Sequence, residues 1–320
     1  MGMKEFFKKC VFLRRFVKML KNYKEFFYDA KDFSNNYEEV AETRGDYKYR
    51  LLLFIHNLEK GMCMEKPRPF GKEKVETVIK ILKRATREEL EQFEYQLAIA
   101  VLKSWVQFFE EKGWEIDDDV QNYIVSLCSS NIKAGASKFR NVDVKTGTFE
   151  DVIFTRRSVR DFSEKPLDEE DIDFAIRCFI ATPTACNRQM CKIYRIKKEK
   201  NIDLLQSKIL GIGGFNLKTV NLFIVTYDIA AFEFYGERSQ GYLNVGLAAM
   251  NFANGLHARG IGSCFMQWSN SRMDDYLVRM ELGIPESERI GVVIGAGYYR
   301  DEVLIPKSTR KPKELIYKIL

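Results

Sequence analysis

Apolar side chains recur every three or four residues through most of the first 132 positions, which is the spacing of helices with one apolar face. This pattern predicts helices over residues 4–33, 37–64, 73–84, 86–112 and 117–132, with a rigid Pro/Gly connector at 67–71. The helix at 86–112 begins with Thr86 and has Glu89 three residues later, which is the pattern of a capping box. Residues 1–135 are therefore expected to be almost wholly helical, and they contain no recognisable catalytic constellation.

The pattern changes after a small-residue and polar stretch at 134–147. Residues 149–155 begin either a strand or a helix, and further helices are predicted at 168–179 and 238–257. Short apolar runs predict strands at 193–196, 222–227, 260–266 and 290–298. The glycine-rich stretch at 211–216 lacks the preceding strand and following helix of a phosphate loop, so a simple loop is expected. The fold class is thus α+β, with a helical N-terminal region of unknown role at 1–140 and a second domain at 141–320.

The 320 residues are enough for two domains or one large one. The seven cysteines are an odd, unpatterned set without zinc-site spacing, which suits a reducing compartment better than a disulfide framework. We find no run long enough to span a membrane and no secretory cleavage pattern near the start. A cytoplasmic location is therefore expected.

The net charge of +6 is concentrated in residues 1–25, which hold eight basic and two acidic side chains. Because the remainder is balanced, a general nucleic-acid-binding surface is not expected. Phenylalanines and tyrosines alternate with the basic residues at helical spacing over residues 1–33. Such a segment can lie on an anionic membrane surface. It can equally pack its apolar side on the rest of the fold or on a partner chain, and this second interpretation is favoured.

Residues 156–162 read Arg-Arg-Ser-Val-Arg-Asp-Phe and place three guanidinium groups and a hydroxyl within five positions. Guanidinium groups stay charged and bind phosphate in a bidentate way, although a solvated basic turn has the same composition. His56 and Glu59 share a helix face, but one such pair does not make a helical metal site, so a structural pair is favoured. His257 has no evident acid partner and is expected on a helix surface or in packing. Walker and G-x-G-x-x-G loops are absent from the sequence.

Three ordered motifs resemble the FMN-dependent nitroreductase family. Arg156 to Arg160 resembles its R-R-S-x-R signature, Ala181 to Gln189 its A-P-S-x-x-N-x-Q loop, and Gly260 to Cys264 its G-L-G-S-C strand entry. The resemblance spans about residues 149–320. It departs from the family pattern after Gln189, where Met190-Cys191 replaces the usual Pro-Trp. It also says nothing about the helical N-terminal half.

The resemblance implies a mixed sheet flanked by helices, in an intertwined homodimer with FMN at the subunit interface. Arg156, Arg160 and Arg310 would hold the phosphate and ribityl chain, assisted by Arg157 and Ser158. The residues implied to contact the flavin from the partner subunit are Pro183, Thr184, Asn187 and Gln189. Phe265, Met266 and Gln267 would lie beside the isoalloxazine ring, with the backbone N–H of Gln267 directed at N5 and Asn216 as a weaker contact.

The function implied is a flavoprotein oxidoreductase of nitroreductase type. It would take hydride from NADH or NADPH and pass it through FMN to a small-molecule acceptor, such as a nitro compound or quinone, by a ping-pong mechanism. Because hydride transfer is the cofactor's chemistry, a missing catalytic histidine does not argue against an enzyme. Two alternatives stay open: a flavin dehydrogenase or tailoring enzyme for one metabolite, and a flavin-fold interaction protein that docks through its basic N-terminus.

Overall fold

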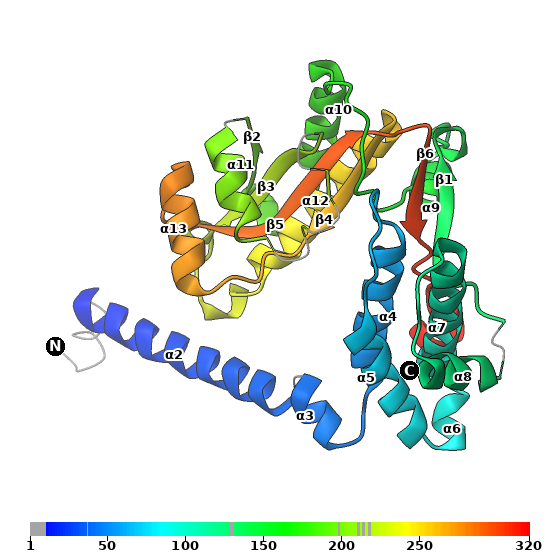
Figure 1. The fold of residues 1–320 in the computed structure, drawn as a ribbon. Coiled ribbons are helices and arrows are strands. Elements are labelled where there is room, and N and C mark those ends of the chain that lie inside the picture. The colour runs from blue at the N-terminus through cyan, green and yellow to red at the C-terminus, as the bar shows by residue number, and fades with distance from the viewer. Residues whose placement is uncertain are drawn as a thin grey trace.

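The computed structural model describes residues 11–36, 38–128, 131–197, 199–209, 212, 215–216 and 219–320. Figure 1 shows a group of helices beside a sheet that carries helices on both faces, with one long helix extending away from them. The helices that precede the sheet are α2 (Val11–Asn36), α3 (Glu38–Thr43), α4 (Lys48–Met62), α5 (Lys72–Arg84), α6 (Arg87–Leu90), α7 (Phe93–Lys112) and α8 (Asp118–Ser126). The expected helical N-terminal region is confirmed over these residues.

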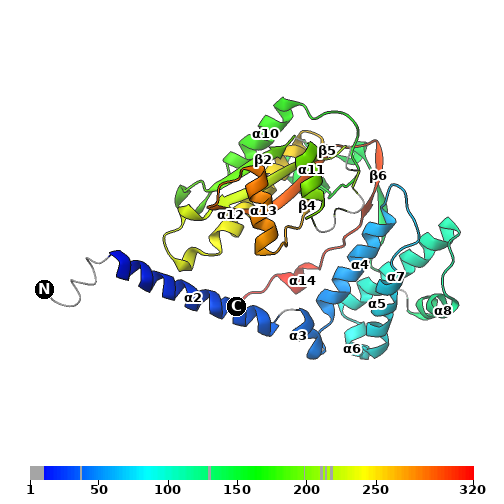
Figure 2. The same ribbon diagram turned by 60° about the vertical axis from the view of Figure 1, so that its left-hand side comes forward.

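Helices α4, α5, α7 and α8 enclose a core of their own. Leu58, Leu102 and Ile124 are completely buried within it. Trp105 and Phe109 stack with ring centroids 4.0 Å apart. Figure 2 shows that α2 lies outside this group, and it is held by an ion pair between Asp29 and Arg238 at 2.5 Å.

The main sheet has four strands in the order β2-β3-β5-β4, and every neighbouring pair is antiparallel. Its strands are β2 (Cys191–Ile196), β3 (Asn221–Asp228), β4 (Ile261–Met266) and β5 (Glu288–Tyr298). At the edge of the sheet, Ser158 forms an isolated parallel bridge with Ser263 of β4. The expected α+β class, with a sheet flanked by helices, is confirmed.

Alternate residues of β3 belong to two different cores, as the two-residue period of a strand requires. Leu222 and Ile224 join a cluster with helices α11 (Glu199–Gln206) and α13 (Arg272–Leu282). Phe223 and Val225 face helices α10 (Glu169–Ile180) and α12 (Gln240–Ala258). The central strand is therefore apolar on both sides, because both sides are covered.

A second sheet pairs the two halves of the chain. It consists of β1 (Ala136–Arg140) and β6 (Glu302–Pro306), which pair antiparallel beside α4. After β6, the Lys307 N–H donates to the Gly135 carbonyl at 2.9 Å and the Lys311 ammonium pairs with Glu94. The C-terminal segment, which includes the short helix α14 (Lys313–Ile316), thus returns to the helical region (Figure 1).

Four expectations about local structure need correction. The helix expected at 37–64 is two helices, because Gly45 takes a left-handed conformation (φ 82°) and Asp46 accepts from the Lys48 N–H. The helix expected at 86–112 is interrupted between α6 and α7, although its capping box is present. The one expected at 117–132 ends at Ser126, and strands β1 and β6 were not expected. Residues 149–155, for which a strand or a helix was expected, form helix α9 (Phe149–Thr155). Two other expectations fall partly outside the described residues: the start of the first helix, at 4–10, and the loop at 211–216, of which three glycines are not described.

We expect Thr86→Ala to lower the free energy of unfolding by about 1 kcal/mol, because the Glu89 N–H loses the hydroxyl that caps it. The half-buried Thr77, whose hydroxyl donates to the Glu73 carbonyl in the preceding turn, is the control and should change stability by less than half as much. Urea unfolding followed by tryptophan fluorescence measures both. Equal effects of the two substitutions would contradict the capping role.

Candidate functional site

The arginine segment at 156–162 runs along the exposed edge of β4. The Val159 N–H donates to the Ser263 carbonyl at 3.1 Å, which continues the sheet by one short parallel contact. Val159 and Phe162 are buried in the sheet core. Ser158 and Arg160 flank Val159 and point to the side opposite its side chain, because neighbouring residues of an extended segment alternate in direction.

On that side lies a cavity of about 770 Å³. It brings together five residues predicted for the site, which are Arg156, Arg157, Ser158, Arg160 and Arg310. Its other walls come from α4, α7, α9 and the segment after β6. Lys307 and Lys311 add two more cations to the lining, and Glu59 is its single carboxylate. The cavity is strongly positive and of a size that accommodates a small-molecule ligand.

Arg156 shows most directly what this cavity is suited to bind. Its Nη1 is buried and has no hydrogen-bond partner among the described residues. Burial holds the pKa of the Arg156 guanidinium below its usual value, and the nearby charges of Arg157 and Arg310 act in the same direction. A buried guanidinium without a partner is costly, so the arrangement favours binding of an anion at this point.

A buried histidine contacts Thr155, the residue that precedes this arginine. His257, on α12, is completely buried, and its Nε2 lies 2.9 Å from the Thr155 hydroxyl while its Nδ1 lies 2.8 Å from the Tyr299 hydroxyl. Burial, together with the charges of Arg156 and Arg157, lowers the pKa of His257 to about 4. The sequence left open a surface or a packing role for His257, and the structure shows the packing role.

The predicted loop at 182–189 lies elsewhere. Among Pro183, Thr184, Asn187 and Gln189, none lines the arginine cavity. Asn187 and Gln189 are exposed and adopt φ values of 53° and 51°, in the left-handed region. The loop is held by the Thr184 hydroxyl, which accepts from the Gln189 N–H at 2.9 Å, and by buried Asn244 of α12, which accepts from the Ala185 N–H at 3.0 Å.

The segment predicted to lie beside the ring also falls outside the cavity lining. The side chain of Met266 is packed in the core, so only its backbone is available to a ligand. Phe265 is 36 % exposed, and the Gln267 amide donates to the Ser269 hydroxyl at 2.5 Å. Asn216 is half-buried, and its carbonyl accepts from the Thr219 hydroxyl at 3.2 Å.

Sequence reasoning did not assign His56 and Glu59 to this site. They pair as expected, with Nδ1 and Oε2 3.6 Å apart, and both line the arginine cavity. Their spacing on a helix was visible in the sequence, but nothing there showed that α4 would face residue 156. Among the described residues no group of histidine, cysteine and carboxylate side chains is arranged to hold a metal.

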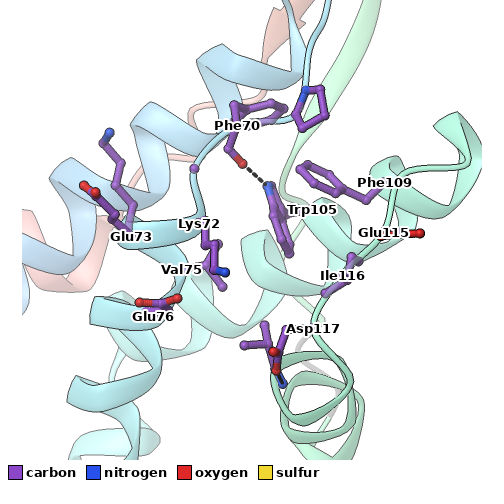
Figure 3. Close-up of a pocket in the computed structure, with 14 residues that line it drawn as sticks. Phe70, Lys72, Glu73, Val75, Glu76, Trp105, Phe109, Glu115, Ile116 and Asp117 are labelled. Atoms are coloured by element: carbon purple, nitrogen blue, oxygen red, sulfur yellow. Dashed lines mark hydrogen bonds between the residues drawn. The ribbon is translucent and has the colours of Figure 1, made fainter.

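A separate cavity of about 420 Å³ lies within the helical region (Figure 3). Phe70, Trp105 and Phe109 form its aromatic side, and the Trp105 indole donates to the Phe70 carbonyl at 3.3 Å. Carboxylates and lysines of α5 and of the α7–α8 connection surround it. The sequence predictions named none of its lining residues as functional.

The fold and the site together define a class of protein. It is an α+β domain with an arginine-lined cavity, suited to an anion, at the edge of its sheet. A family model agrees with the sequence motifs. The model of the nitroreductase family matches residues 153–213 and 219–298. The C-terminal half of the chain is therefore nitroreductase-like, as the three motifs predicted.

Solved structures with similarity to the chain have low sequence identity. An FMN-dependent nitroreductase from Clostridium difficile is 20% identical, with a TM-score of 0.40, and the match covers 46% of this chain and 86% of that one. A nitroreductase family protein from Clostridium novyi is 16% identical over 48% of this chain and 86% of its own, with a TM-score of 0.43. A Desulfovibrio desulfuricans protein assigned as a nitroreductase and solved with FMN is 19% identical over 53% and 96%, with a TM-score of 0.46.

The lowered pKa of His257 predicts a specific loss of stability in acid. Between its ordinary pKa of 6.5 and about 4, the unfolded chain binds a proton at this histidine and the folded chain does not. Stability should therefore fall as the pH falls through this window. In His257→Gln the slope of stability against pH should be smaller by up to one bound proton. His56→Gln serves as the control, at a half-buried histidine. Urea unfolding at pH 7, 6, 5 and 4.5 measures this, and identical slopes in wild type and His257→Gln would contradict it.

Proposed function

We propose that this protein is an FMN-dependent oxidoreductase that takes hydride from NADH or NADPH and passes it to an organic acceptor by a ping-pong mechanism. The observation that carries the proposal is the unpartnered, buried Nη1 of Arg156 in a cavity lined by four arginines. A phosphate monoester suits this donor set, because its oxygens accept bidentate guanidinium hydrogen bonds. The nitroreductase family match supports the choice of FMN among phosphate-bearing cofactors.

In this proposal Arg156 and Arg310 hold the phosphate, and Ser158 and Arg160 contact the ribityl chain and the polar edge of the ring. The flavin, when bound, supplies the hydride-accepting and hydride-donating chemistry. The protein positions it and provides donors where negative charge develops, so no acid or base from the chain is required. The backbone of Met266 and Gln267, at the end of β4, is proposed to lie beside the reactive edge of the ring.

The position of the 182–189 loop bears on the proposed homodimer. Its predicted contact residues lie outside the arginine cavity of their own chain, and Asn187 and Gln189 are exposed. Residues so placed are available to complete the site of a second subunit. We therefore infer that Thr184, Asn187 and Gln189 contact the flavin held by the arginines of the partner.

The basic helix α2 favours a second, docking role. Its aromatic side chains are exposed, and Phe12 and Tyr23 are each at least 67 % exposed. The described structure thus does not pack this apolar side on the rest of the fold, and a partner chain or an anionic membrane surface remains as its contact. No helix among the described residues is long and apolar enough to cross a membrane. We propose a cytoplasmic protein whose α2 makes this contact, and vesicle co-sedimentation with and without residues 1–30 tests the membrane case.

The direct test of the function is the absorbance spectrum of the purified protein with FMN, before and after anaerobic addition of NADH or NADPH. Bound FMN should bleach on addition of the donor and recover on addition of a quinone or nitroaromatic acceptor. Protein that takes up no FMN would contradict the proposal. Bound FMN that reacts with no such acceptor would favour a tailoring enzyme with one specific substrate.

We expect Arg156→Ala combined with Arg160→Ala to weaken FMN binding by about a hundredfold or more, since each lost charge-assisted contact contributes about 1.5–3 kcal/mol. Lys138→Ala combined with Arg140→Ala is the matched control, because these exposed cations of β1 lie outside the cavity. Flavin fluorescence titration measures the affinities, and circular dichroism checks the fold. Unchanged affinity in a folded Arg156/Arg160 variant would place the cofactor elsewhere.

A further inference from the structure

Helix α4 of the helical region shares two cavities with the arginine segment. His56 and Glu59 of α4 line the 770 Å³ cavity. Lys60, on the same helix, lines an adjoining cavity of about 280 Å³. Ser158 and Arg160 line both cavities, so the two form neighbouring parts of one cleft between α4 and the arginine segment.

The two α4 side chains lie at different ends of this cleft. His56 Nδ1 is 3.5 Å from the Ser308 hydroxyl, and Arg310 donates to the Ser308 carbonyl at 2.6 Å, so His56 is at the Arg310 end. Lys60 is one turn further along α4, an advance of about 6 Å. Arg160 is its charged neighbour, and these two residues line the second cavity together.

Lys60 resembles Arg156 in lacking a counter-ion. Burial lowers the pKa of the Lys60 ammonium, and the positive charge of Arg160 lowers it further. Neither Lys60 nor Arg160 forms an ion pair with any described carboxylate. Asp161 also lines the second cavity, but its carboxylate pairs with Arg300 at 3.1 Å. Two neighbouring cations without an ion-pair partner favour the binding of an acceptor group between them.

The wall that carries them is held firmly in place. Buried Glu59 accepts from the Gly135 N–H at 3.0 Å, which ties α4 to the start of β1. Arg300 donates to the Phe162 carbonyl at 3.0 Å and lies 3.8 Å from Glu65, which ties the segment after α4 to the end of the arginine segment. The spacing between the two walls is therefore set by a buried hydrogen bond of Glu59 and by the contacts of half-buried Arg300.

We propose that α4 supplies the second wall of the cofactor site, with His56 contacting the phosphate end of FMN and Lys60 contacting the carbonyl edge of its ring. The inference rests on the proposed function and adds residues from outside the nitroreductase-like half. It follows from two cavities that share Ser158 and Arg160, and from the phosphate-binding arginines lying at the His56 end. A flat ring with carbonyl acceptors at the other end gives Lys60 and Arg160 the acceptor that the chain itself does not provide.

The test compares FMN with riboflavin, which has the same ring and no phosphate. Lys60→Gln should weaken both ligands about tenfold, the effect of losing one hydrogen bond from a charged group. His56→Asn should weaken FMN about fivefold and leave riboflavin unchanged. Lys60→Arg should keep most of the affinity, and Lys80→Gln, at an exposed lysine outside both cavities, should match wild type.

Each outcome of the fluorescence titrations decides one point. If Lys60→Gln matches Lys80→Gln for both ligands while wild type binds FMN, the inference is wrong and the proposed function stands. If His56→Asn weakens riboflavin as much as FMN, its place at the phosphate end is wrong. If wild type binds neither flavin, the proposed function itself fails, and the inference with it. Circular dichroism of every variant, and recovery of affinity in Lys60→Arg, separate lost contacts from lost fold.

Discussion

Uncompensated positive charge is the constraint on which the site depends. Arg156, Arg157 and Arg310 repel one another in a cavity whose single carboxylate, Glu59, is committed to a backbone N–H and to His56. Such an arrangement persists only because the surrounding fold is stable enough to hold it. Burying these cations without acidic partners lowers the stability of the unliganded protein. An anion that binds in the cavity removes this unfavourable free energy, which strengthens its binding.

The fold supplies that support from three directions. The sheet edge fixes the backbone of residues 158–160 through Ser263, and α12 places His257 against the hydroxyl of Thr155, next to Arg156 in the chain. Because His257 is uncharged near neutral pH, it orients the neighbouring hydroxyls without adding another positive charge. The third direction is α4, so the helical region is part of the cleft and not an unrelated attachment.

Periodicity alone predicted most of the secondary structure, because the helices carry clear apolar stripes and β3 is apolar on both faces. It failed at β1 and β6, which have only five residues each and form a sheet only with each other. It also missed the turn at Gly45, where a single left-handed residue divides one apolar pattern into two helices. The arginines of the site were predictable from their motif. The contribution of His56, Glu59 and Lys60 was not, because it depends on how two regions 100 residues apart pack together.

The pairing of β1 with β6 has a consequence for how the protein is made. The chain leaves the ribosome from its N-terminal end, so β1 emerges about 160 residues before the strand that pairs with it. Helices α4 to α8 can bury their apolar core early, but the edge of β1 stays unpaired until β6 has been synthesised. The same final segment carries Arg310 into the cavity. The pairing of β1 and the arrival of Arg310 in the cavity thus both wait for residues 302–311, and a chain that stops before β6 has neither.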